Sequence, residues 1–225
     1  MIQLEHIIRR YRTGGQLVQA LAGVSLHIDR GEFVAITGSS GSGKSTLLNV
    51  LGCLDRPDEG RYLLETVDVA GLDDAALSDA RNQRIGFVFQ SFHLMPRLTV
   101  LENVLLPLRF SRVTPAHDVA ARARELLERV GLGDRTHHRP SELSGGQMQR
   151  AAIARSLVLN PALLLADEPT GNLDSRSAAD ILDLLRELNA AGQTVVMVTH
   201  DMGLAAEAPR QVRLKDGRID NDQRQ

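Results

Sequence analysis

Apolar and polar residues alternate along the first thirty residues of the chain, and the pattern then changes. The stretches LEHIIRRY and GVSLHID within residues 1–30 have the period of two that half-buried strands show. Short, mostly apolar runs follow at residues 32–38, 85–90, 162–169 and 194–200. Runs of this length and composition are typical of strands in the middle of a buried sheet.

Helical spacing separates these runs. Residues 44–52 and 175–191 predict helices, and the second is closed by Gly192. Residues 99–160 look mostly helical and include PAHDVAARARELLERVGL, in which Pro115 suits the first turn of a helix and Gly131 suits its end. The apolar side of that helix predicts a packed face made of Val119, Ala123, Leu126, Leu127 and Val130.

The remaining patterns complete the predicted fold. YLLETVDV at residues 62–69 is strand-like, and QVRLKDGRID predicts a hairpin across Asp216 and Gly217. Buried strands that alternate with helices indicate a mainly parallel α/β sheet. We therefore expect one domain over residues 1–225, with the core and a β region at about 1–90 and 161–225 and a helical subdomain inserted at about 91–160.

Composition narrows the class of protein. The chain has 26 basic against 28 acidic residues, a net charge of −2, which argues against a nucleic-acid platform held by charge alone. The single cysteine, Cys53, excludes an internal disulfide and suits a reducing compartment, and we interpret it as a small buried residue. The N-terminus lacks a signal-peptide layout, and no apolar run approaches the ~18 residues of a membrane span. We expect a soluble protein, to which a partner supplies any membrane part.

A phosphate-binding loop follows the first buried run. The stretch at 38–45 fits the pattern G-x-x-x-x-G-K-[ST] between a predicted strand and a predicted helix. Glycines let backbone N–H groups point at phosphates, and the helix N-terminus adds a positive dipole end. We expect Lys44 to reach the β- and γ-phosphates of a nucleoside triphosphate and the Ser45 hydroxyl to hold Mg²⁺. The predicted loop comprises Gly38, Ser39, Ser40, Gly41, Ser42, Gly43, Lys44, Ser45 and Thr46.

Two carboxylates end the buried run LLLADE at residues 163–168. Ligands of open α/β sheets bind at the carboxyl ends of strands, so we expect Asp167 to serve the Mg²⁺ directly or through water. Two adjacent carboxylates repel each other, which is unfavourable unless a cation lies beside them or one of them has a catalytic role. Glu168 is therefore the candidate general base that orients and deprotonates water, and a structural ion pair is the alternative for this residue.

Three further side chains are candidates for the same site. His200 ends the run TVVMVTH, and we expect it to contact a γ-phosphate from the same sheet edge. Gln90 ends the run IGFVFQ, where it can bind Mg²⁺ or water and report on the following loop. Tyr11 lies in a predicted N-terminal strand, where it can stack on a base, although ordinary packing is an alternative.

A second glycine pair, in ELSGGQMQR at residues 142–150, precedes another predicted helix. Together the motifs resemble the nucleotide-binding subunit of an ABC transporter, in family order and over nearly the whole chain. The matching elements are Tyr11 (A-loop), GSSGSGKST at 38–46 (Walker A), Gln90 (Q-loop), LSGGQ at 143–147 (signature), LLLADE at 163–168 (Walker B), GNLD at 171–174 (D-loop) and His200 (H-loop). The resemblance implies a P-loop NTPase core of the RecA-like type, with an N-terminal antiparallel β region and an inserted α-helical subdomain.

The resemblance also explains why two phosphate-binding sequences occur in one chain. In this family two subunits dock head-to-tail and hold two ATP molecules between them, so the signature of one subunit touches the γ-phosphate bound by Lys44 of the other. The resemblance implies a homodimer that binds ATP and Mg²⁺, and it implies that a monomer is a poor ATPase. The residues that would act on the second subunit's ATP are Ser144, Gly145, Gly146 and Gln147.

A finer resemblance concerns the subgroup that includes macrolide-export and lipoprotein-release ATPases. It is carried by LLNVLGCLDRPDEGRY, RNQRIGFVFQSFHLMPRLTVLENVLLPL and LADEPTGNLD. The subgroup implies a cytoplasmic subunit on the inner face of the cell membrane, bound to a separate FtsX-like permease with a large extracytoplasmic domain, and no nucleic acid. We expect the permease to contact the chain near Gln90–Val104, where exposed apolar residues are alternatively local core.

Two other functions stay open at this point. The chain is alternatively a regulatory ATPase of the cell-division type, which switches an extracytoplasmic partner and transports nothing. A soluble ABC ATPase that acts on DNA or ribosomes is disfavoured, because such proteins usually carry a fused second copy or long coiled coils, which this chain lacks. The transported substrate is set by the permease and cannot be read from this chain.

Overall fold

Two sheets form the framework of the protein, which we describe from a computed structural model that covers residues 1–112 and 118–224. The larger sheet has six strands in the order β10-β9-β3-β8-β7-β6, and the smaller has four in the order β2-β1-β4-β5. In the larger sheet β9, β3, β8, β7 and β6 are mutually parallel, and only β10 is antiparallel to its neighbour. The smaller sheet is antiparallel throughout.

The bounds of β3, β6, β7, β8, α1 and α6 follow the predicted runs closely. The larger sheet contains β3 (Phe33–Thr37), β6 (Ile85–Phe89), β7 (Leu163–Asp167), β8 (Thr194–Val198), β9 (Arg210–Lys215) and β10 (Arg218–Arg224). The smaller sheet contains β1 (Ile2–Thr13), β2 (Gln16–Ile28), β4 (Glu59–Leu64) and β5 (Val67–Asp68). The helices are α1 (Lys44–Leu51), α2 (Asp74–Arg84), α3 (Val100–Leu105), α4 (Val119–Arg129), α5 (Gly145–Leu157), α6 (Ser175–Ala190) and α7 (Met202–Ala206). Short 3-10 helices are η1 (Leu106–Phe110), η2 (Gly133–Arg135) and η3 (Pro140–Glu142).

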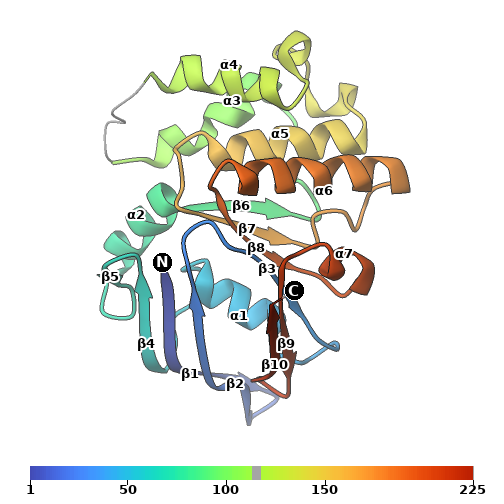
Figure 1. Ribbon diagram of the computed structural model, residues 1–225. Coiled ribbons are helices and arrows are strands. Elements are labelled where there is room, and N and C mark those ends of the chain that lie inside the picture. The colour runs from blue at the N-terminus through green and yellow to red at the C-terminus, as the bar shows by residue number, and fades with distance from the viewer. Residues whose placement is uncertain (113–117, 225) are drawn as a thin grey trace.

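Both faces of the parallel sheet are buried, which explains its almost wholly apolar strands. Side chains such as Ala35, Leu164 and Val195 face a core shared with α3, α4, α5 and α6. Their neighbours Val34, Leu165 and Val196 face a second core, which includes α1 and the strands of the smaller sheet. Figure 1 shows these layers: helices α3 to α6 lie on one side of the parallel sheet, and α1 lies on the other.

The predicted strand at residues 62–69 is wrong as a single element. The chain turns back after Leu64, and β5 pairs with β4 in antiparallel register, with Leu64 opposite Val67. Glu65 takes the left-handed conformation with φ 57°. Its carboxylate is paired with Arg30 and Arg84, so tertiary contacts hold a turn that the apolar pattern did not predict.

Two helices were not predicted. Helix α2 buries only Leu77 and Ala80, so its apolar stripe is too thin to stand out, although Asp73 caps it by accepting a hydrogen bond from the Ala76 N–H at 2.8 Å. Helix α7 is a five-residue segment that follows its N-cap Asp201. In both cases a capping aspartate was the available signal.

The predicted helix after Pro115 is confirmed in its packed face and its end. Helix α4 begins at Val119, and the Asp118 side chain accepts hydrogen bonds from the N–H groups of Ala120 and Ala121. Pro115 itself lies outside the described residues. Gly131 follows the helix with φ 72°, the left-handed conformation that suits a helix end. The predicted apolar face, Val119, Ala123, Leu126, Leu127 and Val130, is buried.

Cys53 is buried, as predicted, and burial raises the pKa of its thiol to about 12. The thiol therefore stays protonated at neutral pH and is a poor nucleophile. Within residues 1–112 and 118–224, no helix has the length and apolar content that crossing a bilayer requires.

Candidate active site

One edge of the parallel sheet collects the residues that the sequence singled out. Phe89, Asp167 and Val198 are aligned as neighbours across β6, β7 and β8, and Ile36 of β3 is aligned with Val198. The residues that follow these positions therefore emerge side by side: Gln90 after β6, Glu168 at the end of β7, His200 after β8 and the phosphate loop after β3. This is the carboxyl edge, where open α/β sheets bind ligands.

The phosphate loop is a tight cradle. A Cβ atom on Gly38 would lie 2.3 Å from the Leu214 carbonyl oxygen and 2.6 Å from Ser42 Oγ. A Cβ on Gly43 would lie 2.6 Å from the Ala20 carbonyl oxygen, and Gly43 has φ 105°. Only glycine fits either position. Gly43 is also the N-cap of α1 and provides no side-chain cap, so the first N–H groups of the helix stay available to an anion.

Lys44 lies over this loop. Its ammonium donates hydrogen bonds to the carbonyl oxygens of Gly38 at 2.8 Å and Ser39 at 2.9 Å. These neutral acceptors are weaker partners for a cation than phosphate oxygens, so the arrangement fits a loop that receives a polyphosphate. The glycine cradle, the uncapped helix start and the lysine are together what a nucleoside triphosphate requires.

The Asp167 carboxyl lies close to two charges. Burial raises the pKa of Asp167 above its ordinary value, the charge of neighbouring Glu168 raises it further, and the Lys44 ammonium opposes both effects. A cation beside Asp167 would relieve the repulsion between the two carboxylates. Asp167 therefore fits a role beside a metal ion.

The Glu168 carboxylate is held by three contacts from the end of β8. The His200 backbone N–H donates to Oε1 at 2.8 Å, and the His200 ring nitrogen Nδ1 lies 2.6 Å from the same oxygen. The buried hydroxyl of Thr199 donates to Oε2 at 2.9 Å. Glu168 has φ 46°, an uncommon conformation for a residue with a side chain. The contact with His200 that the structural ion-pair alternative requires is therefore present. It fixes the orientation of the Glu168 carboxylate, which is 17% exposed, whereas the His200 side chain is 77% exposed.

Gln90 contacts the GNLD segment at two points. Its Nε2 donates to Asn172 Oδ1 at 3.1 Å, and Asn172 Nδ2 donates back to the Gln90 carbonyl oxygen at 3.0 Å. A Cβ on Gly171 would lie 2.7 Å from Gln90 Nε2, so glycine is required for this contact. The role of Gln90 as a metal ligand stays a prediction, as do those of Ser45 and Asp167.

The predicted Mg²⁺ site has few protein ligands. In the described part of the chain, no group of three or more His, Cys, Asp or Glu side chains could hold a metal ion. The predicted set of Ser45, Gln90 and Asp167 offers one carboxylate, one amide and one hydroxyl. Such a set suits Mg²⁺ that completes its octahedron with phosphate oxygens and water.

Tyr11 lies away from the strand ends, in the smaller sheet. Its hydroxyl donates to Asp55 Oδ2 at 2.5 Å, and the Arg9 guanidinium lies 4.8 Å from the centre of its ring. These contacts fix the ring and support the packing alternative. Stacking of the ring on a base stays a prediction.

The second glycine pair opens helix α5 in the helical lobe. Ser144 is the N-cap: it accepts a hydrogen bond from the Gln147 N–H at 3.3 Å, and the Gln147 side chain accepts one from the Ser144 N–H at 2.9 Å. A Cβ on Gly146 would lie 2.9 Å from Ser177 Oγ, so this glycine lets α5 approach α6 closely. Figure 1 places α5 and α1 on opposite sides of the parallel sheet, so the two phosphate-binding sequences belong to different lobes.

Sequence reasoning missed the residues that connect these parts. The buried side chain of Gln149 on α5 donates to the carbonyl oxygens of Phe89 at 3.3 Å and Pro169 at 2.5 Å, so it ties the signature helix to the segments beside Gln90 and Glu168. Arg155 on the same helix donates to the carbonyl oxygens of Phe92 and His93, at 2.8 Å and 2.5 Å. A polar residue on the buried side of a predicted helix was the only signal.

Comparison with known proteins agrees with this geometry. Residues 21–171 match the family described as ABC transporter. The chain is 52% identical over 224 residues to an uncharacterized ABC transporter ATP-binding protein of Thermotoga maritima, covering 100% of this chain and 95% of that one. It is also 52% identical to the macrolide export ATP-binding/permease protein MacB 1/2 of Paracoccus denitrificans, of which it spans 33%.

Solved structures extend the likeness to three dimensions. The fold matches the dimeric structure of MJ0796, a bacterial ABC transporter cassette, with a TM-score of 0.88 and 46% identity over 100% of this chain and 98% of that one. It matches equally a dimeric post-hydrolysis state of the same cassette bound to ADP and Pi, with a TM-score of 0.88 and 45% identity over the same shares of the two chains. The family match covers more than half of the chain, and the order of motifs agrees with it. This chain belongs to the ABC transporter family and is one of its ATP-hydrolysing nucleotide-binding cassettes.

Proposed function

We propose that the chain powers a membrane permease that exports its substrate, with two ATP molecules held between two copies of the chain. The observation that carries the ATP-hydrolysing part of the proposal is the clamped Glu168 carboxylate beside Asp167, at the same sheet edge as the phosphate loop. The macrolide-export relative is named as both an ATP-binding protein and a permease, and this chain spans 33% of its length. The permease would hold the chain against the inner face of the membrane.

In this proposal the residues of the sheet edge divide the work of hydrolysis. Lys44 leaves the carbonyl oxygens of its loop and binds the β- and γ-phosphates, which are stronger acceptors. Ser45, Gln90 and Asp167 would hold Mg²⁺, which neutralises charge on the phosphate oxygens when it is bound. Glu168 takes a proton from the attacking water, and His200 and Thr199 keep its carboxylate in the required orientation.

A second copy would complete each site. The MJ0796 cassette that this fold resembles is a dimer in two solved structures. Ser144, Gly145 and Gly146 open a helix whose N-terminus is an anion site, and this N-terminus lies in the helical lobe instead of at the chain's own phosphate loop. We infer that these residues contact the γ-phosphate bound by Lys44 of the second copy.

The permease would dock in an apolar groove that borders the predicted contact segment Gln90–Val104 at Phe89 and Leu106 but includes none of its residues. A cavity of about 450 Å³ lies between α2, β6, η1 and α5. Its apolar lining is Leu54, Ile85, Phe87, Phe89, Leu106, Pro107, Phe110 and Leu159. Phe110 is 70% exposed and Leu54 48%, so the groove presents apolar surface that a partner would cover. Arg155 borders the groove and also binds the carbonyl oxygens of Phe92 and His93, so an occupant would act directly on the loop after Gln90.

Replacing Phe110 with glutamate should abolish permease binding without changing the ATPase activity of the isolated chain. A charge in a desolvated apolar interface is strongly unfavourable. The test is affinity purification of the chain from its native membranes with Mg-ATP, followed by identification of the membrane protein recovered. Met202→Glu is the matched control, since Met202 is 61% exposed on α7 and lies outside the groove. If Phe110→Glu and the control recover equal amounts of the membrane protein, this docking site is refuted. If neither the natural chain nor any variant recovers a membrane protein, the transport proposal is refuted.

Replacing Thr199 with valine should lower kcat about tenfold and leave the KM for ATP nearly unchanged. Valine keeps the buried shape but cannot donate to Glu168 Oε2 or accept the Asp201 N–H, which the threonine hydroxyl does at 3.0 Å. Steady-state kinetics on purified protein would measure both constants, and thermal unfolding would report any loss of fold. Thr199→Ser restores the hydroxyl and should recover most of kcat. A valine variant with normal kcat would show that the hydroxyl does not position Glu168.

A further inference from the structure

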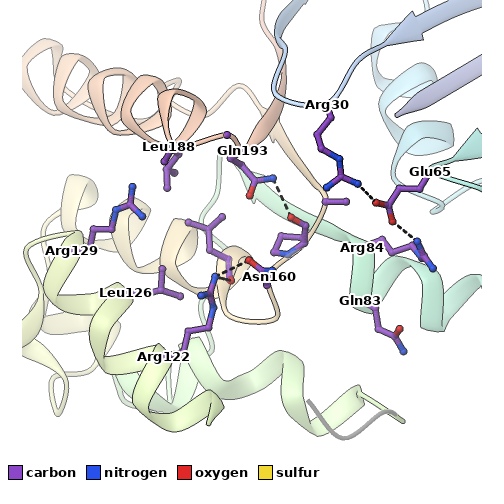
Figure 2. A pocket seen from close by; sticks show the side chains of 15 residues that line it. Arg30, Glu65, Gln83, Arg84, Arg122, Leu126, Arg129, Asn160, Leu188 and Gln193 are labelled. Carbon is purple, nitrogen blue, oxygen red and sulfur yellow. Dashed lines mark hydrogen bonds and ion pairs between the residues drawn. The ribbon is translucent and has the colours of Figure 1, made fainter. Parts of the chain in front are cut away.

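A second polar cavity lies at the edge of the parallel sheet opposite the active site. Its volume is about 450 Å³, and its lining includes residues that lie one to three positions before four strands: Arg30 before β3, Arg84 before β6, Pro161 before β7 and Gln193 before β8. These are the amino ends of the strands, whereas the phosphate loop and Glu168 follow the carboxyl ends. The cavity is therefore separate from the nucleotide site. Figure 2 shows its lining.

The cavity is strongly cationic in a chain of net charge −2. Four arginines line it against one carboxylate, Glu65. Arg30 and Arg84 come from one side and share that carboxylate as an ion-pair partner, as Figure 2 shows. A single negative charge between two guanidinium groups leaves this side positive.

The arginines of α4 face the cavity without any carboxylate partner among the described residues. Arg122 donates to the Leu157 carbonyl oxygen at 3.3 Å and to Asn160 Oδ1 at 3.1 Å, both neutral acceptors. Its Nε is buried and has no hydrogen-bond partner. Among the described residues, Arg129 has no ion-pair partner. It also borders a neighbouring hollow that is lined by acidic residues of α6. A buried donor without a partner costs free energy, which an anion in the cavity would recover.

We propose that this cavity binds a small polyanion of the phosphate type, which bridges α4 of the helical lobe and the residues before the parallel strands. Guanidinium groups bind phosphate oxygens through paired, charge-assisted hydrogen bonds. The amides of Gln83 and Asn160 add neutral donors to the lining. Because charges lie on both sides of the cavity, a ligand with two phosphate groups fits better than a single monoanion.

The test is calorimetric titration of the chain with inorganic pyrophosphate. The titration uses the Lys44→Ala background, so that the phosphate loop does not dominate the signal. We expect saturable binding of one pyrophosphate per chain. Arg122→Gln should weaken it about tenfold, the loss that one charge-assisted hydrogen-bond partner typically causes. Because Arg122 also contacts Leu157 and Asn160, Arg129→Gln serves as a second variant without those contacts, and it should weaken binding in the same direction.

Arg124→Gln is the matched control, because Arg124 is exposed on the same helix and does not line the cavity. Its affinity should equal that of the background. No saturable binding, or equal affinity in all three variants, would overturn the proposal. Sedimentation with phosphatidylcholine vesicles that contain phosphatidic acid then distinguishes the source of the phosphate. Vesicle binding that Arg129→Gln weakens would support the site with a lipid headgroup as ligand, and pyrophosphate binding without vesicle binding would support a soluble ligand.

Discussion

The Glu168→Gln chain should bind ATP normally and hydrolyse it at least ~100-fold more slowly than the natural chain, the contribution expected of a general base. Glutamine keeps the size of the side chain, and its carbonyl oxygen still accepts a hydrogen bond from Thr199 or the His200 N–H. It cannot take a proton from water. ATP that is bound but not hydrolysed should then hold two copies together, so the dimer should accumulate.

Two measurements check this expectation. Single-turnover hydrolysis gives the rate at the site, and sizing chromatography with Mg-ATP gives the oligomeric state. Glu65→Gln is a matched control, because Glu65 is also ion-paired but lies at the opposite edge of the sheet. It should hydrolyse ATP at nearly the natural rate. Turnover within about twofold of the natural chain in Glu168→Gln would exclude Glu168 as the base, and a variant that stays monomeric with Mg-ATP would contradict the nucleotide-held dimer.

The Ser144→Arg chain should lose ATP hydrolysis almost completely while each copy still binds nucleotide through its own phosphate loop. Arginine removes the N-cap of α5 and places a bulky side chain where the γ-phosphate of the second copy's ATP would lie. Loss of the cap alone costs about 1 kcal/mol of stability. The larger effect should be on turnover, which is measured by steady-state hydrolysis alongside nucleotide binding by fluorescence titration.

A control separates the two effects. Asp118→Arg removes the N-cap of α4, a helix of the same lobe, without touching the signature. It should retain most of the hydrolysis. Unchanged turnover in Ser144→Arg would refute the role of the signature altogether.

Mixing two inactive variants tests whether the signature acts on the other copy. A dimer of one Ser144→Arg chain and one Lys44→Ala chain contains one site with both an intact Lys44 and an intact Ser144, provided that the two residues come from different copies. Mixing should therefore restore part of the hydrolysis. If the signature served its own chain, both copies of such a dimer would be defective. Absence of any restoration would contradict the composite site.

Much of this protein follows from short stretches of sequence. The apolar runs of β3 and β8 are wholly buried and those of β6 and β7 mostly so, and this burial leaves a pattern within five residues. The phosphate loop is equally visible in the sequence, because Gly38, Gly43 and Lys44 lie in one short segment between a strand and a helix, although the carbonyl oxygens that exclude a Cβ at the two glycines belong to the distant residues Leu214 and Ala20. The motifs, their order and the family could therefore be predicted without a structure.

Elements held by distant contacts escaped prediction. The turn at Glu65 interrupts a strand-like run, because Arg30 and Arg84 bind a carboxylate that a local pattern assigns to a strand. Helix α2 has only two buried side chains, so its position depends on packing against β6 and not on a broad apolar stripe. Local propensity is a weak determinant in such cases, and tertiary contacts override it.

The sequence by itself determined which groups serve the candidate site; the tertiary structure decided how they are held. Glu168 is clamped by Thr199 and His200 because β7 and β8 are neighbours in the sheet, an order that no residue spacing states. The order of the strands also lets Gln149 bind the segments that follow two of them. It likewise brings arginines from distant parts of the chain into the lining of one cavity. Spacing along a chain encodes contacts within a few turns or strands, whereas contacts between elements depend on sheet order and on how the two cores pack.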